Sequence, residues 1–400
     1  MSARGKTIFI LGAARFDSPV ASTSFTLAKH LAQNNRVYYI DYPFTWRDQI
    51  ALRHTKEFKT REKYFRRSSK PYFTTENPNL KVLIVPPVAS INFLPEGRLY
   101  RFLLSLVERT IRNRIRQVLR AEGISDFIYI NSFNFHYPNI SRGLFPKLTV
   151  YHCVDPVIVE YDLRHGKISE EILVRDSDLV ICTSKQLYDE KAGANSRCYF
   201  VPNAADIHHS RKALDEAVPV HPALHAVRKP IIGYFGNIER RMDFDLLRSV
   251  IDLNRDKTFV FAGPVSEDTV PEWFLSDPLV YLTGSISYEE MPSMVKGFDV
   301  AIIPFKKDGV SATIFPLKLF EYLGAGKPVV ATDFNPDLKE FTGETVYYCS
   351  TAEAFSAAIT EALNNNSKQC ISQRLQVAEA NTWVRRAAEF EEILRENYPV

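Results

Sequence analysis

The chain has 400 residues, of which 45% are hydrophobic and 24% charged. This is ordinary composition for about two to three globular domains, and it excludes disordered and collagen-like chains. Fifty Lys and Arg residues against 47 Asp and Glu residues give a net charge of +3, which excludes a surface built as a whole to bind nucleic acid or another polyanion.

The cysteine pattern and the apolar runs indicate in which cellular compartment the protein is expected. Five widely spaced cysteines without a C-x-x-C pair indicate neither a disulfide framework nor a zinc site. The N-terminus lacks the pattern of a signal peptide, and no apolar run reaches the roughly 18 residues of a membrane span. We expect a cytoplasmic protein, soluble or peripheral at the inner face of the plasma membrane.

Short apolar runs separated by turn residues predict two α/β sheets. Runs that do not alternate with polar residues are typical of parallel strands buried on both faces. The first sheet is expected from strands at 7–11, 37–41, 81–87, 127–131, 148–155, 178–184 and 197–203, with a helix to residue 33. After a polar stretch from 206 to 230 the pattern restarts, with strands at 230–237, 258–264, 279–284, 299–305 and 327–333 and helices at 243–254, 288–297 and 316–324.

Two segments of the first half are strongly basic. Residues 47–70 carry nine Lys or Arg against three acids, and residues 98–120 carry seven Arg against one acid in an amphipathic helical pattern. One interpretation is a core helix with a solvated arginine face and ion pairs to neighbouring elements. The other is an anionic membrane surface, or an anionic acceptor, as the partner of both segments.

The turn after the first strand is a candidate phosphate site. Gly12 precedes the expected helix, and a helix N-terminus attracts anions. The turn reads G-A-A-R-F-D-S-P and is neither G-x-G-x-x-G nor a P-loop, which disfavours a plain dehydrogenase and a P-loop enzyme. Small residues here also suit the close approach of another segment.

The densest chemical signal lies between Ser311 and Asp333. Pro316 opens a helix that carries Lys318 and Glu321 three residues apart near its N-terminus. A lysine can neutralise phosphate charge, and a carboxylate can accept hydrogen bonds from two ribose hydroxyls. The alternative is a surface ion pair that contributes less than about 1 kcal/mol.

The segment P-L-K-L-F-E-Y-L-G-A-G-K-P-V-V-A-T resembles the donor-nucleotide signature of GT-B glycosyltransferases of the family 4 kind, the glycosyl transferases of group 1. Other motifs follow the family's order over roughly residues 145 to 385. They are D-S-D-L-V-I-C-T-S, V-P-N-A-A-D, I-I-G-Y-F-G-N, F-V-F-A-G-P, Y-L-T-G-S-I-S-Y-E-E-M-P and D-V-A-I-I-P-F. With Y-H-C-V-D-P (151–156), the likeness is to bacterial cell-surface polysaccharide transferases of the teichuronic acid type.

The resemblance implies a GT-B fold, in which two Rossmann-like domains with parallel sheets face each other across a cleft. It implies an acceptor-side domain at 1–205, a linker at 206–229, a donor-nucleotide domain at 230–371 and a C-terminal helix at 372–400 that packs back on the first domain. The implied activity is the transfer of a sugar from a nucleoside-diphosphate sugar to a cell-surface polysaccharide or lipid-linked glycan. The implied chemistry retains the anomeric configuration and uses neither a metal nor a further cofactor.

The resemblance also assigns site residues. Glu321 is expected to bind ribose and Lys318 the leaving diphosphate, with further donor contacts at Gly12, Gly236, Asn237, Gly263, Gly284, Pro316 and Leu317. The chain departs from the family where two phosphate-binding cations are expected, because those positions hold Asn237 and Met242. Arg240 or Arg241 is expected to take over that role, and Thr313 stands where many members carry a first glutamate.

A catalytic base, if one is required, is expected in the first domain. His152 and Asp155 end a predicted strand, and parallel strands present functional groups at their carboxyl ends. His136 and Glu160 are further candidates, whereas His208 and His209 of the linker have no expected role. Each of these groups also has a purely structural interpretation as a turn former or a hydrogen-bonded core residue.

Two other functions remain open at this stage. A sugar-nucleotide epimerase on the same fold would need paired acid and base residues. A degenerate binding protein would keep the donor pocket without transfer, in line with the missing cations at Asn237 and Met242.

Overall fold

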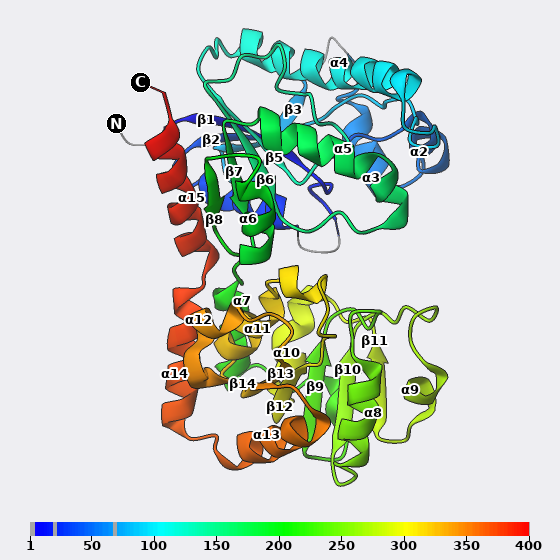
Figure 1. The fold of residues 1–400 in the computed structure, drawn as a ribbon, viewed down its shortest axis with the longest axis vertical. Helices are drawn as coiled ribbons and strands as arrows, with labels where there is room; N and C mark the ends of the chain where they lie inside the picture. Colours follow the sequence, from blue (N-terminus) through cyan, green and yellow to red (C-terminus); the bar gives the residue numbers. More distant parts are fainter. Residues whose placement is uncertain (1–4, 19–21, 67–69, 400) are drawn as a thin grey trace. The chain divides into compact units, whose positions relative to one another are not determined.

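The computed structural model describes residues 5–18, 22–66 and 70–399, and it divides into two units (Figure 1). Unit 1 comprises residues 1–202 and 387–400, and unit 2 comprises residues 203–386. Each unit is built around its own mostly parallel sheet, as the apolar runs predict. Arg67 of the first basic segment lies outside the described residues.

Unit 1 contains an eight-stranded sheet in the order β3-β4-β2-β1-β5-β6-β7-β8, in which only β3 is antiparallel to its neighbour among the described pairs. The strand β4 ends earlier than predicted, because Pro86 and Pro87 follow and lack the N–H group that a ladder requires. Its elements are β1 (Thr7–Gly12), α1 (Thr23–Leu31), β2 (Arg36–Ile40), α2 (Trp46–Ala51), α3 (Lys56–Glu62), β3 (Tyr72–Thr74), β4 (Leu80–Leu83), α4 (Arg98–Ala121), β5 (Ile128–Ser132), β6 (Leu148–Cys153), α5 (Glu160–Asp176), β7 (Leu179–Cys182), α6 (Lys185–Ala192) and β8 (Cys198–Phe200).

Unit 2 contains a six-stranded parallel sheet in the order β11-β10-β9-β12-β13-β14. Its buried core is formed by these strands and by the inner faces of the helices around them. Its elements are α7 (Ile207–Arg211), β9 (Ile231–Phe235), α8 (Phe244–Asp252), β10 (Thr258–Ala262), α9 (Glu272–Ser276), β11 (Val280–Gly284), α10 (Met291–Lys296), β12 (Val300–Ile303), α11 (Leu317–Gly324), β13 (Val329–Thr332), α12 (Leu338–Thr342), β14 (Val346–Cys349), α13 (Ala352–Asn364) and α14 (Lys368–Ala380).

The expected linker at 206–229 is part of unit 2 and not a free connection. It forms α7 and two short 3₁₀ turns, and Ile207, Ala213 and Leu224 are buried in the core of unit 2. The polar composition of this segment gave no sign that these widely spaced apolar residues are buried. The boundary between the units therefore falls at residue 203, earlier than the predicted 206.

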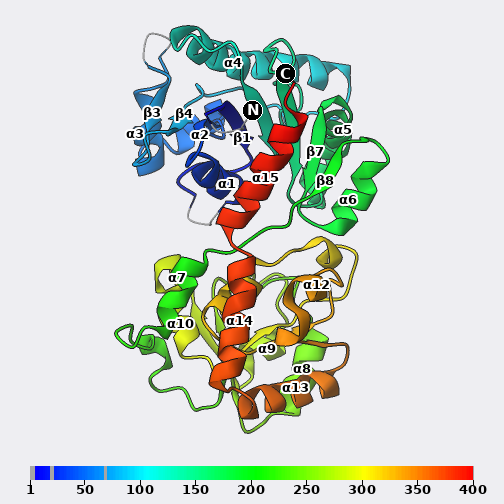
Figure 2. The same cartoon turned by 90° about the vertical axis from the view of Figure 1, so that its left-hand side faces the viewer.

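The predicted C-terminal helix at 372–400 is two helices. The first is α14, whose Arg374 donates a hydrogen bond to the carbonyl of Gly326 within unit 2. The second is α15 (Trp383–Asn397), which from Ala387 onward belongs to unit 1. Figure 2 shows α15 lying over unit 1 between α1 and β8, where Asn35 donates to Glu391 and Asn397 to Tyr199. The chain thus returns to unit 1 with α15, from Ala387 onward, whereas α14 stays in unit 2.

Helix α4 has the amphipathic face that the sequence predicts. Its residues Leu104, Val107, Ile111, Ile115 and Val118 are buried in the core of unit 1. None of the helices in the three described ranges has both the length and the apolar character of a membrane span.

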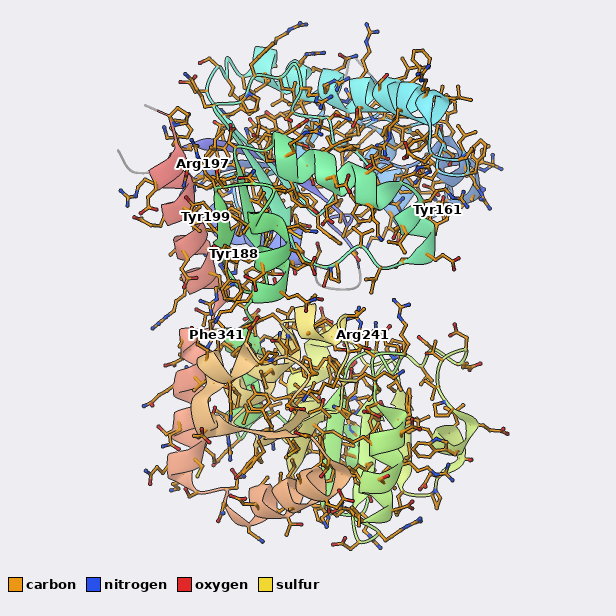
Figure 3. The ribbon with its side chains drawn as sticks, viewed as in Figure 1. Tyr161, Tyr188, Arg197, Tyr199, Arg241 and Phe341 are labelled. Atoms are coloured by element: carbon orange, nitrogen blue, oxygen red, sulfur yellow. The ribbon has the colours of Figure 1, made fainter. Side chains whose placement is uncertain are left out.

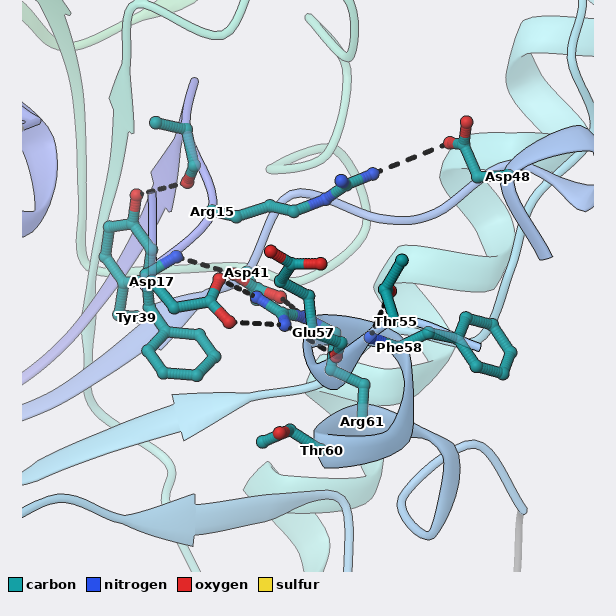
Figure 4. A network of polar contacts seen from close by, with 12 residues as sticks. Arg15, Asp17, Tyr39, Asp41, Asp48, Thr55, Glu57, Phe58, Thr60 and Arg61 are labelled. Carbon is teal, nitrogen blue, oxygen red and sulfur yellow. Dashed lines mark hydrogen bonds and ion pairs between the residues drawn. The ribbon is translucent and has the colours of Figure 1, made fainter. Parts of the chain in front are cut away.

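One residue of the basic segment 47–70 is a core residue. Arg61 on α3 is 1% exposed and donates to Asp41 at 2.6 Å and to both carboxylate oxygens of Asp17 at 2.6 and 2.8 Å (Figure 4). Its guanidinium also lies 4.6 Å from the ring centroid of Phe16. These contacts fasten α3 to the end of β2 and to the loop that follows β1.

We therefore expect Arg61→Leu to lower the free energy of unfolding by about 3 kcal/mol, because it leaves the carboxylate of Asp41 buried without its cation. Lys59→Leu on the exposed side of α3 is the matched control, with an expected change within about 0.5 kcal/mol. Urea titration followed by circular dichroism measures both. Equal midpoints for Arg61→Leu and the parent would contradict this account of the network.

Candidate functional site

Three neighbouring strands of unit 2 end in glycines at one edge of the sheet. Gly236 follows β9, Gly263 follows β10, and Gly284 ends β11. The N–H of Gly236 donates to the carbonyl of Ala262 at 2.8 Å, and that of Gly263 donates to Gly284 at 2.9 Å. A Cβ at Gly263, whose φ is +153°, would lie 2.1 Å from the carbonyl oxygen of Gly236. Glycine is therefore required here for the loops to approach each other closely.

The helix α11 follows the central strand β12 along the chain. Pro316 precedes its first turn, no side chain caps that turn, and the turn contains no acidic residue. The N–H groups and the helix dipole therefore keep their partial positive charge at this end.

The amine of Lys318 lies against the turn after β9. It donates a hydrogen bond to the hydroxyl of Tyr234 and sits 4.1 Å from the centroid of that ring. A Cβ at Gly236 would lie 2.7 Å from Nζ, so the missing side chain makes room for the amine. Burial lowers the pKa of Lys318 to about 7, although the nearby Glu321 carboxylate acts in the opposite direction. Such desolvated cations are typical of functional sites.

Glu321 lies one turn further along α11 and is 8% exposed. Its Oε1 accepts a hydrogen bond of 2.8 Å from the hydroxyl of Tyr288. Burial raises the pKa of Glu321, while this hydrogen bond and Lys318 lower it. The structure thus brings the two predicted residues into one electrostatic unit.

Tyr288 and His209 are site neighbours that the sequence prediction missed. Their rings stack with centroids 4.6 Å apart, and Nε2 of His209 lies 2.7 Å from the carbonyl oxygen of Tyr288. Tyr288 stands in the motif Y-L-T-G-S-I-S-Y-E-E-M-P, which was a usable signal. His209 had none, because its segment reads as a linker.

The substitute cations differ in position. Arg241, labelled in Figure 3, lies with Nε 3.1 Å from Glu239 and close enough to Lys318 to lower its pKa. Arg240 is exposed, as is the side chain of Asn237, whose carbonyl accepts a hydrogen bond from Tyr234. Met242 is fully buried. Arg241 is therefore the better placed of the two arginines.

The candidates of unit 1 are not brought together. His152 is 3% exposed, its Nδ1 shares a 3.0 Å hydrogen bond with Ser132 Oγ, and its ring contacts Phe390 edge-on. Burial lowers the pKa of His152 to about 3, so the imidazole is neutral. Asp155 is exposed. This environment fits the structural interpretation of His152 better than that of a proton acceptor.

The other unit 1 candidates also have structural surroundings. His136 lies 3.8 Å from Asp162, with a pKa lowered by burial, and Glu160 opens α5. A Cβ at Gly12 would lie 2.0 Å from the hydroxyl of Tyr39. Gly12 thus makes room for Tyr39, which agrees with close packing as the reason for this glycine.

A metal ion would be another way to hold an anion at such a site. Across residues 5–18, 22–66 and 70–399, no three His, Cys, Asp or Glu side chains are grouped so as to hold a metal ion. Basic residues and N–H groups are the features of the site that suit an anion.

Comparisons with known proteins support the resemblance seen in the sequence. Residues 229–365 match the family model described as glycosyl transferases group 1. The chain is 27% identical over 237 residues to the putative teichuronic acid biosynthesis glycosyltransferase TuaH of Bacillus subtilis, an alignment that covers 57% of this chain and 59% of that protein. The match thus spans less than two thirds of the relative.

Solved structures share the fold over the whole chain. The sucrose-phosphate synthase of Thermosynechococcus elongatus has a TM-score of 0.64 at 14% identity, with 98% of each chain covered. HepE of Anabaena, solved in complex with UDP, has a TM-score of 0.62 at 13% identity and covers 98% of this chain and 100% of its own. The predicted GT-B fold is confirmed.

We expect Lys318→Met to stabilise the protein at pH 7 by about 1–2 kcal/mol, because it removes a cation from a poorly solvated position. The folded-state pKa of about 7 lies below the ordinary 10.5, so the unfolded chain binds more protons between these values. Stability of the parent therefore rises across this window, and the advantage of Lys318→Met shrinks toward pH 10.

Urea denaturation at pH 7, 8.5 and 10 measures this trend. Lys306→Met, at an exposed lysine of the same unit, is the control and should show no such pH dependence. A parent more stable than Lys318→Met at pH 7 would contradict the cost assigned to this lysine.

Proposed function

We propose that this protein is a glycosyltransferase that takes a sugar from a nucleoside-diphosphate sugar. The observation that carries the proposal is the joint position of Lys318, Glu321 and the uncapped start of α11 beside the glycine edge of the sheet. The match of residues 229–365 to glycosyl transferases group 1 supports it, and so does the fold shared with a UDP complex.

In the proposed reaction the bond between the anomeric carbon and the β-phosphate oxygen breaks. An acceptor hydroxyl forms the new bond to that carbon, and its proton leaves to the diphosphate or to solvent. Negative charge grows on the diphosphate as the bond breaks, so donors aimed at it lower the barrier. Lys318, Arg241 and the N–H groups of α11 would fill this role in place of a divalent metal.

Glu321 would hold the ribose through its two hydroxyl groups. Among the described residues Glu321 accepts a hydrogen bond from Tyr288 alone, so its carboxylate has further lone pairs for the ligand. We further propose a retaining reaction and an acceptor that belongs to a cell-surface polysaccharide or a lipid-linked glycan. The name of the Bacillus subtilis relative supports this acceptor class.

Incubation with a panel of UDP-, GDP-, ADP- and dTDP-sugars tests the activity. We expect slow release of free nucleoside diphosphate from one donor and release of the sugar with unchanged configuration. An altered epimer ratio in the remaining donor would identify an epimerase instead. Tight binding of a nucleoside diphosphate without hydrolysis, and without transfer to any membrane-lipid extract, would identify a degenerate binding protein.

We expect Glu321→Ala to weaken nucleoside diphosphate binding by about 100-fold, since two hydrogen bonds to a carboxylate contribute on the order of 3 kcal/mol. Tyr288→Phe removes only the hydroxyl that orients Glu321 and should cost less. Isothermal titration calorimetry measures both affinities. Unchanged affinity in Glu321→Ala would refute the ribose assignment.

For Lys318→Met we expect turnover to fall by roughly 100-fold, with a much smaller loss of donor affinity, because charge on the diphosphate is greatest in the transition state. Donor hydrolysis with saturating sugar nucleotide gives turnover, and calorimetry gives affinity. A variant in which the Michaelis constant alone changes would show a uniform binding contact and would favour Arg241 as the stabilising cation.

A further inference from the structure

The outer face of α4 exposes a row of large apolar side chains. Leu99, Phe102 and Leu106 are 63%, 61% and 45% exposed, and their spacing of three and four residues places them on one stripe of the helix. Phe93, in the segment before α4, is 69% exposed. Exposing such a row to water does not stabilise the fold. Contiguous exposed apolar area of this kind is typical of an interaction site.

The same stripe becomes basic along its length. Arg109, one turn after Leu106, is exposed, and so is Arg120 near the end of the helix. Beside them lies a hollow of about 420 Å³ whose lining includes Arg109, Arg112, Arg116 and Arg142. The one carboxylate in its lining, Glu108, is buried and accepts a hydrogen bond from the N–H of Asn139.

The hollow is held in shape by its own hydrogen bonds. Arg112 donates to the carbonyl of Asn139 at 2.9 Å, and Arg116 donates to that of Gly143 at 3.0 Å. Arg142 is paired with Asp176 yet keeps 58% of its side chain exposed. Arg112 is only 16% exposed and lies 3.9 Å from Glu108, so it shapes the hollow. The exposed guanidinium groups of Arg109 and Arg142 suit the phosphate of a lipid headgroup.

The basic segments therefore do not contribute equally to this surface. Arg61 and Arg114 are core residues, and Arg114 donates to the carbonyls of Tyr64 and Phe65. The net charge of 98–120 overstates the available cations for this reason. What the structure adds is the apolar row, which charge counting does not reveal.

We propose that the outer face of α4 binds an anionic lipid bilayer. In this arrangement Leu99, Phe102 and Leu106 enter the boundary between headgroups and acyl chains, and the arginines of the hollow hold lipid phosphate. An amphipathic helix lying in the interface plane gains from both contributions. The inference goes beyond the proposed transfer reaction and does not depend on it.

A second copy of the chain is a poorer occupant. A two-fold pairing of antiparallel α4 helices would set the apolar half of one helix against the arginine half of the other. A pairing that crosses near Arg109 would place like charges opposite each other. An anionic bilayer matches both halves of the stripe at once.

Co-sedimentation of the full chain with vesicles of phosphatidylcholine, with and without 30% phosphatidylglycerol, tests the proposal. We expect binding to the anionic vesicles alone, with a strong reduction at 0.5 M salt. Phe102→Ser combined with Leu106→Ser should weaken binding at least tenfold. Leu253→Ser combined with Leu275→Ser, at exposed leucines of unit 2, should leave it unchanged.

The charge arm uses Arg109→Ala with Arg120→Ala, against Lys212→Ala with Lys339→Ala in unit 2. The first pair should weaken binding at least fivefold and the second should not, although both remove two positive charges. If both pairs weaken binding equally, net charge and not this face is responsible. No sedimentation at low salt would overturn the proposal, as would a dimer that Phe102→Ser dissociates while vesicles have no effect.

A fluorescent reporter guards against a folding defect in these variants. Phe102→Trp should show a blue-shifted emission with anionic vesicles, whereas Leu253→Trp should show none. Absence of a shift at Phe102→Trp, in a protein that still sediments with the vesicles, would place the contact elsewhere and refute the role of α4.

Discussion

Lys318 and Glu321 lie one turn apart on α11, where Glu321 is buried and Lys318 is half-buried against the turn after β9. Burial acts on them in opposite directions, because it lowers the pKa of the lysine and raises that of the carboxyl group. Each charge partly compensates the other, yet neither is neutralised by an ion pair at contact distance in the described structure. Gly236 and Gly263 are needed so that backbone and amine approach this closely.

The central strands of both sheets follow from the apolar runs, since parallel strands buried on both faces carry a strong local signal. The short edge strands β3 and β14 were not predicted. The sequence also predicted that Lys318 and Glu321 share one face of a helix, because Pro316 opens the helix and the two residues are three positions apart. The sequence did not predict the contribution of Tyr288 and His209, because it depends on contacts between segments about eighty residues apart. The boundary at 203 was missed for the same reason, as Ile207 and Leu224 are anchors only once the core exists.

The net charge of a segment of unit 1 does not show which of its arginines are buried. The segments 47–70 and 98–120 contain arginines of two kinds, and local sequence does not separate them. Arg61 can be buried because Asp17 and Asp41, from two other segments, supply three hydrogen-bond acceptors for its guanidinium group. Arg109 lies on the same stripe of α4 as Leu106 and stayed at the surface. The ion-pair interpretation of the basic segments thus holds for Arg61. An anionic partner for the exposed arginines stays a prediction.

The partners of Lys318 and Glu321 explain how both charges can remain available to a ligand. Lys318 donates to the hydroxyl of Tyr234, which in turn donates to the carbonyl of Asn237, and Glu321 accepts from Tyr288. Burial raises the pKa of both tyrosines, so both hydroxyls stay neutral. A neutral hydroxyl satisfies the geometry of a charged group without cancelling its charge. A phosphate or a ribose can therefore add to these contacts without first breaking an ion pair, whereas a tight salt bridge at the same positions would oppose binding with its own Coulomb energy.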